Sequence, residues 1–128
     1  MSKTSKNTVI KVGSVLLGLA FIMSGGMKLT GPAEMAANFT HWGYPVWFMY
    51  VVGALEVAGG IGLMIPSLAG LAATGLVAIM LGAVFTHVRA GEWGAIVPPA
   101  VLLTLSFLVA RARRSPVLAR LGLVPQPA

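Results

Sequence analysis

One carboxylate stands inside an apolar stretch that is long enough to cross a membrane. Glu56 is the only acidic residue in the run 46–65. A charged group at that depth is costly unless a partner pairs with it, a proton neutralises it or water reaches it. Ionisable residues in spanning helices usually face a bundle interior or a polar cavity, so Glu56 is the first candidate for a functional site.

Polar residues near the ends of neighbouring apolar stretches are the expected companions of Glu56. Lys28 ends the first stretch and His87 ends the third, and Tyr50 precedes Glu56 on the second. We expect an outward-opening pocket with Glu56 at its floor and the other three residues at its rim. Small residues spaced three or four apart predict the helix faces that bring these side chains together. The predicted faces are Ser14, Gly18, Phe21 and Gly25 on the first stretch, Gly53, Gly59 and Gly60 on the second, and Gly75, Gly82, Ala83 and Thr86 on the third.

Helix geometry predicts that Lys28 and Glu56 lie at different depths. If Trp47 marks the outer boundary, a rise of ~1.5 Å per residue puts Glu56 about 13 Å below it, near the middle of the core. Lys28 and His87 are then about 10 Å higher than Glu56. This difference in height disfavours a direct Lys28–Glu56 salt bridge unless the helices tilt or water fills the pocket.

Each candidate also has a purely structural interpretation. The Lys28 side chain could extend to the headgroups, as lysines near helix ends often do. His87 could bond to backbone carbonyls at a helix end. Glu56 could be a protonated acid that bonds across to a threonine or to the backbone.

Composition places the chain among integral membrane proteins. Of its 128 residues, 57% are hydrophobic and 9% are charged, whereas soluble domains carry roughly 25% charged residues. The chain has no cysteine, which excludes disulfides, thiolate metal sites and cysteine nucleophiles. The net charge of +6 comes mainly from basic residues that flank apolar stretches, a pattern typical of contact with lipid headgroups and not with nucleic acid.

The apolar stretches predict an all-α fold, an integral membrane four-helix bundle. The expected spans are 9–28, 46–65, 67–88 and 95–110, between an N-terminal tail (1–8) and a basic C-terminal tail (111–128). The positive-inside rule places both tails in the cytoplasm. We therefore expect a multi-pass protein of the inner, cytoplasmic membrane. The basic residues that carry this prediction, and that we expect to touch lipid headgroups, are Lys3, Lys6, Lys11, Arg111, Arg113 and Arg114.

The connection between the first two spans is the longest loop and predicts a short interfacial helix on the outer surface. Gly31-Pro32 opens this loop, and Met35 and Phe39 give it a modest apolar stripe. Aromatic residues at the boundaries of the spans are typical membrane-interface anchors, although the same residues could line a ligand entrance. The expected anchors are Trp42, Tyr44, Trp47 and Trp93.

No catalytic motif follows from the residue pattern. The sequence shows no phosphate-binding loop after a strand and no arrangement of serine, histidine and acid that predicts a triad. With two histidines and three acidic residues in the chain, no metal site is expected. Enzymatic activity is therefore the less favoured hypothesis.

Several short segments together resemble the DoxX-like family over most of residues 13–110. They are the run 24–31 (SGGMKLTG), Trp42-Gly43-Tyr44-Pro45, the run 53–56 (GALE) with Gly59-Gly60, and Thr86-His87 with Gly91. The resemblance implies a small four-helix membrane bundle with Lys28, Glu56 and His87 as its polar positions. The family name comes from components associated with quinol oxidase and thiosulfate:quinone oxidoreductase.

Residues and resemblance together favour a non-catalytic accessory or binding subunit of a redox-linked or quinone-linked membrane assembly. No cofactor is predicted from the residues themselves, and a bound quinone or lipid is the expected occupant of the pocket. The expected partners are membrane lipids and other membrane subunits or further copies of the chain. Two alternatives stay open, a component of a quinol-linked oxidoreductase and an oligomeric transporter that is proton-coupled or carries a small molecule.

Overall fold

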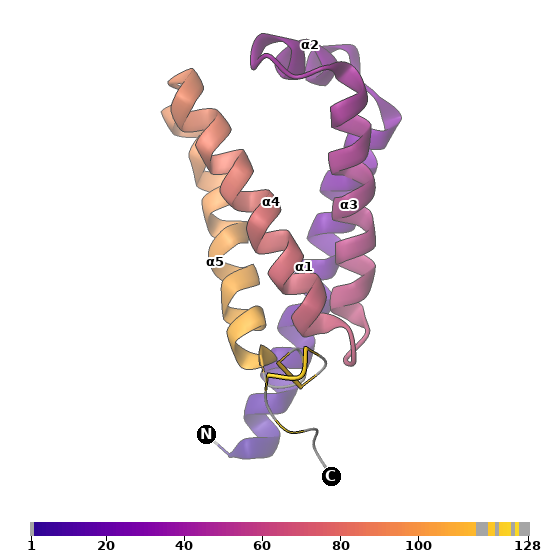
Figure 1. Cartoon of the computed structure of the whole chain (residues 1–128), viewed down its shortest axis with the longest axis vertical. Helices are drawn as coiled ribbons and strands as arrows, with labels where there is room; N and C mark the ends of the chain where they lie inside the picture. Colours follow the sequence, from indigo (N-terminus) through magenta and orange to yellow (C-terminus); the bar gives the residue numbers. More distant parts are fainter. Residues whose placement is uncertain (1, 115–117, 120, 124, 126–128) are drawn as a thin grey trace.

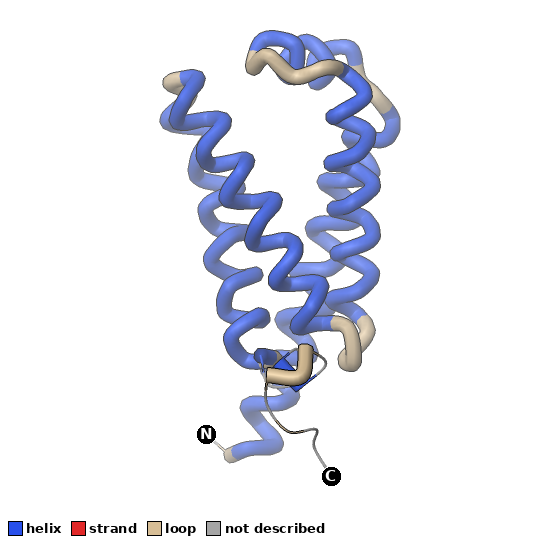
Figure 2. Tube along the Cα trace, viewed as in Figure 1, coloured by secondary structure: helices blue, strands red, loops and turns tan. Residues whose placement is uncertain are grey.

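The computed structural model describes residues 2–114, 118–119, 121–123 and 125, and all regular structure in those residues is helical. Four helices are long and apolar enough to cross a membrane, so the predicted fold class is confirmed. The elements, shown in Figure 1 and by type in Figure 2, are α1 (Lys3–Thr30), α2 (Ala33–His41), α3 (Val46–Met64), α4 (Ala69–Ala90), the 3-10 turn η1 (Trp93–Ile96) and α5 (Val97–Ala112).

Helix α1 is longer than the predicted span. It starts at Lys3 because Ser2 caps it, with the Ser2 hydroxyl accepting a hydrogen bond from the Ser5 amide at 3.1 Å. It ends where Gly31 adopts a left-handed conformation, φ 65°. Most of the predicted N-terminal tail is thus helical and extends beyond the ~20 residues that a membrane span requires.

The fourth span is built from two pieces. The turn η1 precedes α5, and prolines occupy the first positions of α5, where a missing backbone N–H costs no hydrogen bond. Together η1 and α5 give an apolar helical segment of 20 residues, Trp93–Ala112, instead of the predicted 95–110. Part of the predicted C-terminal tail, including Arg120, lies outside the described residues.

The helices form two hairpin-like pairs that diverge toward one end. Figure 1 shows α1 beside α3, and α4 beside α5, with α2 crossing the end where the pairs separate. The start of α1, the end of α5 and the α3–α4 turn share the opposite end, which we call the termini end. The basic residues at the starts and ends of these helices are therefore gathered at one end of the bundle. The side of the membrane that this end faces stays a prediction.

Backbone contact between glycines holds α1 against α3. A Cβ placed on Gly60 would lie 2.6 Å from the carbonyl oxygen of Gly18, and one on Gly53 would lie 2.8 Å from that of Gly25. No larger residue fits at these points without moving a backbone, which is how small residues bring membrane helices together. The small-residue faces predicted for the first two spans meet at these glycines, whereas the predicted Gly59 lies against Leu76 of α4.

The face predicted for the third span is wrong in part. Gly75 and Gly82 are exposed, and a Cβ on either would meet nothing within 4 Å. Ala83 and Thr86 of the predicted face do point inward, since Ala83 packs against the core and Thr86 is buried. The rest of the packed stripe consists of larger or unpredicted positions, namely Ala69, Ala73, Leu76 and Met80. Glycine is common in membrane helices whether or not it forms a contact, so its presence alone did not identify the packed face.

The termini half of the bundle is filled with side chains from all four long helices. The cluster centres on residues that are nearly or fully inaccessible, namely Leu17, Phe21, Leu63, Ala73, Leu76, Met80 and Val109. The half nearer α2 lacks such a continuous core. This difference leaves room there for a cavity.

Candidate functional site

Glu56 forms a direct ion pair with Lys28 inside the bundle. The glutamate is 1% exposed, and Lys28 Nζ lies 3.0 Å from its Oε1. The ammonium also donates to Glu56 Oε2 at 3.3 Å and to the Ser24 hydroxyl at 3.0 Å. The expectation that depth separates Lys28 from Glu56 is therefore wrong.

The register between α1 and α3 explains the error. At the Gly25–Gly53 contact, a Cβ on Gly53 would lie 2.8 Å from Lys28 Cβ, so Lys28 is level with Gly53. Glu56 is less than one helical turn, about 5 Å, further along α3. Helix α3 starts above the end of α1, so Trp47 and the end of α1 do not mark the same depth.

A cavity of about 460 Å³ opens from the ion pair toward α2. Lys28, Glu56 and Ser24 supply polar groups on the α1–α3 side. Most of the remaining surface is apolar and comes from α2, α3, α4 and α5. Apolar lining residues include Phe39, Phe48, Val52, Leu55, Ile79, Met80, Ala83 and Leu102. A mostly apolar hollow with a few convergent polar groups is the usual form of a site for a small lipophilic ligand.

The four predicted pocket residues are not all in this cavity. Lys28, Glu56 and His87 line it. Tyr50 does not, and its hydroxyl instead lies against Gly31 at the end of α1. Tyr50 precedes Glu56 by six residues, a spacing that places two side chains on different faces of a helix. The predicted placement of Tyr50 at the rim is therefore wrong.

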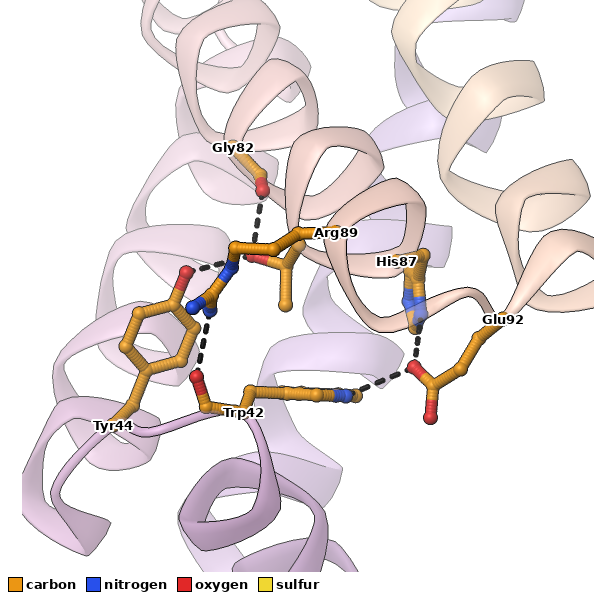
Figure 3. Close-up of polar contacts among 7 residues, drawn as sticks. Trp42, Tyr44, Gly82, His87, Arg89 and Glu92 are labelled. Atoms are coloured by element: carbon orange, nitrogen blue, oxygen red, sulfur yellow. Dashed lines mark hydrogen bonds and ion pairs between the residues drawn. The ribbon is translucent and has the colours of Figure 1, made fainter.

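Polar side chains join the α2–α3 loop to the end of α4, as Figure 3 shows. Several of them line the end of the cavity nearer α2, which we call its mouth. Trp42 Nε1 donates to Glu92 Oε1 at 2.9 Å, and His87 Nδ1 lies 2.9 Å from the same oxygen. Arg89 donates to the Trp42 carbonyl at 2.6 Å. We call the residues of this network the mouth cluster: Trp42, Tyr44, Thr86, His87, Arg89 and Glu92.

Tyr44 adds a second link between the same elements. Its hydroxyl lies 2.8 Å from Thr86 Oγ1, and Thr86 donates to the Gly82 carbonyl, also at 2.8 Å. Because the Thr86 proton is used on Gly82, Tyr44 is the donor in the Tyr44–Thr86 hydrogen bond. The Arg89 guanidinium stands 5.5 Å from the centre of the Tyr44 ring, within range of a cation–π contact.

The electrostatics of the mouth cluster centre on Glu92. The hydrogen bond from His87, and after it the one from Trp42, hold the pKa of the Glu92 carboxyl below its ordinary value. Glu92 is thus ionised near neutral pH and acts only as an acceptor. Arg89 is turned toward Trp42 and Tyr44.

The four predicted anchors separate into two pairs. Trp47 and Trp93 are 64% and 67% exposed, and their role as interface anchors stays a prediction. Trp42 and Tyr44 are half-buried and line the cavity, which is the alternative that the sequence left open for the aromatic residues. Loop backbone turns both rings inward, since Gly43 between them has φ 89°.

Sequence reasoning missed Glu92 as a site residue. Its only signal in the sequence was its position five residues after His87, with Gly91 between them. Gly91 is left-handed, φ 73°, and this turn brings Glu92 back to the His87 ring. Among the described residues, no group of three histidine or acidic side chains is placed to hold a metal ion. The polar groups that line the cavity are the Lys28–Glu56 pair, Ser24, Asn38 and four members of the mouth cluster: Trp42, Tyr44, Thr86 and His87.

Comparison with known proteins places this arrangement in a family. The sequence pattern of the DoxX-like family matches residues 12–109, which is most of the chain. The uncharacterized protein YdgD of Bacillus subtilis (strain 168) is 32% identical over 72 residues, covering 52% of this chain and 63% of YdgD. No solved structure matches the chain significantly. The chain belongs to the DoxX-like family of membrane proteins.

Proposed function

We propose that this protein binds a small lipophilic molecule in the cavity, with an oxygen of that molecule accepting a hydrogen bond from Lys28. The observation that carries the proposal is the Lys28–Glu56 pair beside an otherwise mostly apolar hollow. The Lys28 side chain is 17% exposed and the Glu56 side chain 2%, so Lys28 is the more accessible member of the pair. A quinone is the class of ligand that we favour, and a lipid is the alternative.

Energetics argue that the ion pair is more than a structural bond. Taking two charges out of water costs several kcal/mol for each ion, and well-packed apolar residues in their place are often as stable or more stable. Glycine contacts already hold α1 to α3, one beside the ion pair at Gly25–Gly53 and one toward the termini end at Gly18–Gly60. Holding a charged donor at a fixed point in an apolar cavity is a function that apolar residues cannot replace.

The form of the cavity favours binding over transport. Toward the termini end, in the described part of the bundle, Phe21, Leu63 and Leu76 are at most 1% exposed and fill the space between the helices. A ligand that enters from the α2 end therefore meets a packed core beyond Glu56. A binding subunit needs one opening, whereas a transporter needs access from both sides.

We further propose that the cavity faces outward and that the protein works with other membrane subunits. The basic residues of the termini end favour a cytoplasmic position for that end, which turns α2 and the cavity mouth to the outer surface. The span that contains α5 is the least covered by the rest of the protein, with 11% of its 18 most apolar consecutive residues buried, compared with 28–33% for the other spans. This is the side on which lipid, another subunit or a second copy has most surface to contact.

Solvent extraction of the purified protein tests the binding proposal. The matched control is the double variant K28M/E56M, which removes both charges together and leaves neither unpaired. We expect mass spectrometry of the extract to find one lipophilic compound enriched with the wild type and depleted with the double variant. Identical extracts from two folded proteins would refute the proposal.

A further inference from the structure

A carboxylate and an indole fix the orientation of the His87 ring at the cavity mouth. Glu92 Oε1 lies 2.9 Å from His87 Nδ1, and Trp42 Nε1 donates to the same oxygen at 2.9 Å. The Trp42 and His87 rings also meet edge to face, with 5.2 Å between centroids and an interplanar angle of 84°. The imidazole is therefore positioned before a ligand arrives, as a preorganised contact should be.

These contacts leave one ring nitrogen of His87 available. Because the ionised Glu92 carboxylate can only accept, Nδ1 must carry the proton in their hydrogen bond. The other nitrogen, Nε2, makes no hydrogen bond with any residue that the structure describes. The His87 side chain lines the cavity and is 17% exposed. Nε2 is thus the atom of this ring that a ligand can reach.

Among the polar groups that line the cavity, Lys28 and His87 are contact points on opposite helix pairs. Lys28 belongs to α1, which packs with α3, and His87 belongs to α4, which packs with α5. The lining between and around them is largely apolar, with Val52, Leu55 and Ala83 among its residues. A ligand with a single polar head would leave one of the two points without a partner.

We infer that His87 is a second ligand-contacting residue and that the ligand carries two oxygen functions on an apolar body, one for Lys28 and one for His87 Nε2. This inference rests on the proposed binding function and narrows its ligand class. Lipophilic diols and hydroxyketones fit both points, because their hydroxyl can donate a hydrogen bond to an unprotonated Nε2. Diones, whose oxygens only accept, fit both points when Nε2 carries a proton. Fatty acids and simple long-chain alcohols fit only one point, because each has its polar atoms at a single end. Glu92 and Trp42 are positioning residues, which act by orienting the imidazole.

A matched pair of fluorescent probes tests the inference in protein reconstituted into nanodiscs. The probes are 2-naphthol, with one oxygen, and 2,6-dihydroxynaphthalene, with two. The readout is the ratio of their dissociation constants. We expect the dihydroxy probe to bind the wild type about tenfold more tightly, the gain typical of one added hydrogen bond of about 1.4 kcal/mol.

Variants of the histidine assign that ratio to one residue. His87→Phe keeps an aromatic ring against Trp42 and removes Nε2, so the ratio should fall to about one. Glu92→Ala keeps the imidazole but frees its orientation, so the ratio should fall part of the way. His41→Phe is the control, because His41 is exposed and is not a lining residue, and its ratio should match the wild type.

The possible results separate the two-oxygen ligand from the binding function on which it rests. If 2-naphthol binds the wild type and weakens in K28M/E56M, yet the dihydroxy probe gains nothing, the two-oxygen inference is overturned and the binding function stands. A gain that survives in a folded His87→Phe protein would overturn the inference in the same way. If neither probe binds the wild type and solvent extraction finds no enriched compound, the binding function fails as well.

Discussion

The two polar groups of the cavity are held in different ways. Lys28 and Glu56 come from long helices whose backbones touch at glycines, and Glu56 is 1% exposed. The mouth cluster joins a loop to a helix end, and its Glu92 side chain is 34% exposed. The position of the Lys28–Glu56 pair, which we call the inner pair, is therefore set by helix register. The position of the mouth cluster is set by the turns at Gly43 and Gly91.

This difference predicts how each site responds to change. A group buried between packed helices cannot be rehydrated without separating them, so losing its partner costs the full desolvation of the remaining charge. A group at the mouth can turn to water when its partner is removed. The inner pair should thus affect stability strongly, and the mouth cluster should affect it weakly while still shaping ligand choice.

Removing one member of the inner pair should destabilise the protein most. Lys28→Met leaves Glu56 without its partner and should lower the free energy of unfolding by about 3–5 kcal/mol. The double variant K28M/E56M should recover most of that loss. SDS-induced unfolding of the three proteins measures both values. A single variant as stable as the double one would contradict a buried, partner-dependent charge.

The glycine contact that sets the register should come next. Gly25→Ala places a Cβ against the Gly53 backbone, so α1 and α3 must separate, and we expect a loss of about 1–3 kcal/mol. Gly26→Ala is the matched control, because a Cβ there meets nothing within 4 Å. The same unfolding assay compares them. Equal losses in the two variants would show that the close contact does not determine the register.

A single hydrogen bond at the mouth should matter less. Tyr44→Phe removes the bond to Thr86, whose own proton stays on the Gly82 carbonyl, and should cost about 1 kcal/mol. Tyr50→Phe is the control, since no hydrogen bond is found for Tyr50 among the described residues. Thermal unfolding distinguishes the two. A loss in Tyr44→Phe no larger than in Tyr50→Phe would mean that the Tyr44–Thr86 hydrogen bond does not stabilise the protein.

Acidification should change stability least and should act at Glu92. Its pKa in the folded protein lies below the ordinary value of 4.5, so its contribution is complete above that pH and is lost as the pH falls through the lowered pKa. The stability difference between the wild type and Glu92→Gln should therefore shrink below pH 4.5. Unfolding temperatures at pH 6 and at lower pH measure it. A difference that grows on acidification would mean that the folded protein does not favour the ionised carboxylate.

The sequence was most informative where hydropathy and small residues set the structure. Four apolar spans, a short helix in the connection between the first two, and the packing of α1 on α3 through small residues follow from hydropathy and residue spacing. The Lys28–Glu56 contact did not, because it depends on the relative height of two helices, which the Gly25–Gly53 contact fixes. The Glu92–His87 contact was not predicted either, because it depends on a left-handed turn at Gly91. Such a turn is a matter of local backbone geometry and leaves no periodic pattern in the sequence.

Whether the inner pair serves binding is decided by a fluorescence titration of 2-naphthol into nanodiscs that contain either the wild type or K28M/E56M. Both proteins keep the apolar cavity, and only one keeps the charged donor. Saturable binding to the wild type, weakened about tenfold or more in the double variant, is the result that a functional Lys28–Glu56 pair predicts. Equal affinity for the two proteins would show that the pair serves structure and not binding.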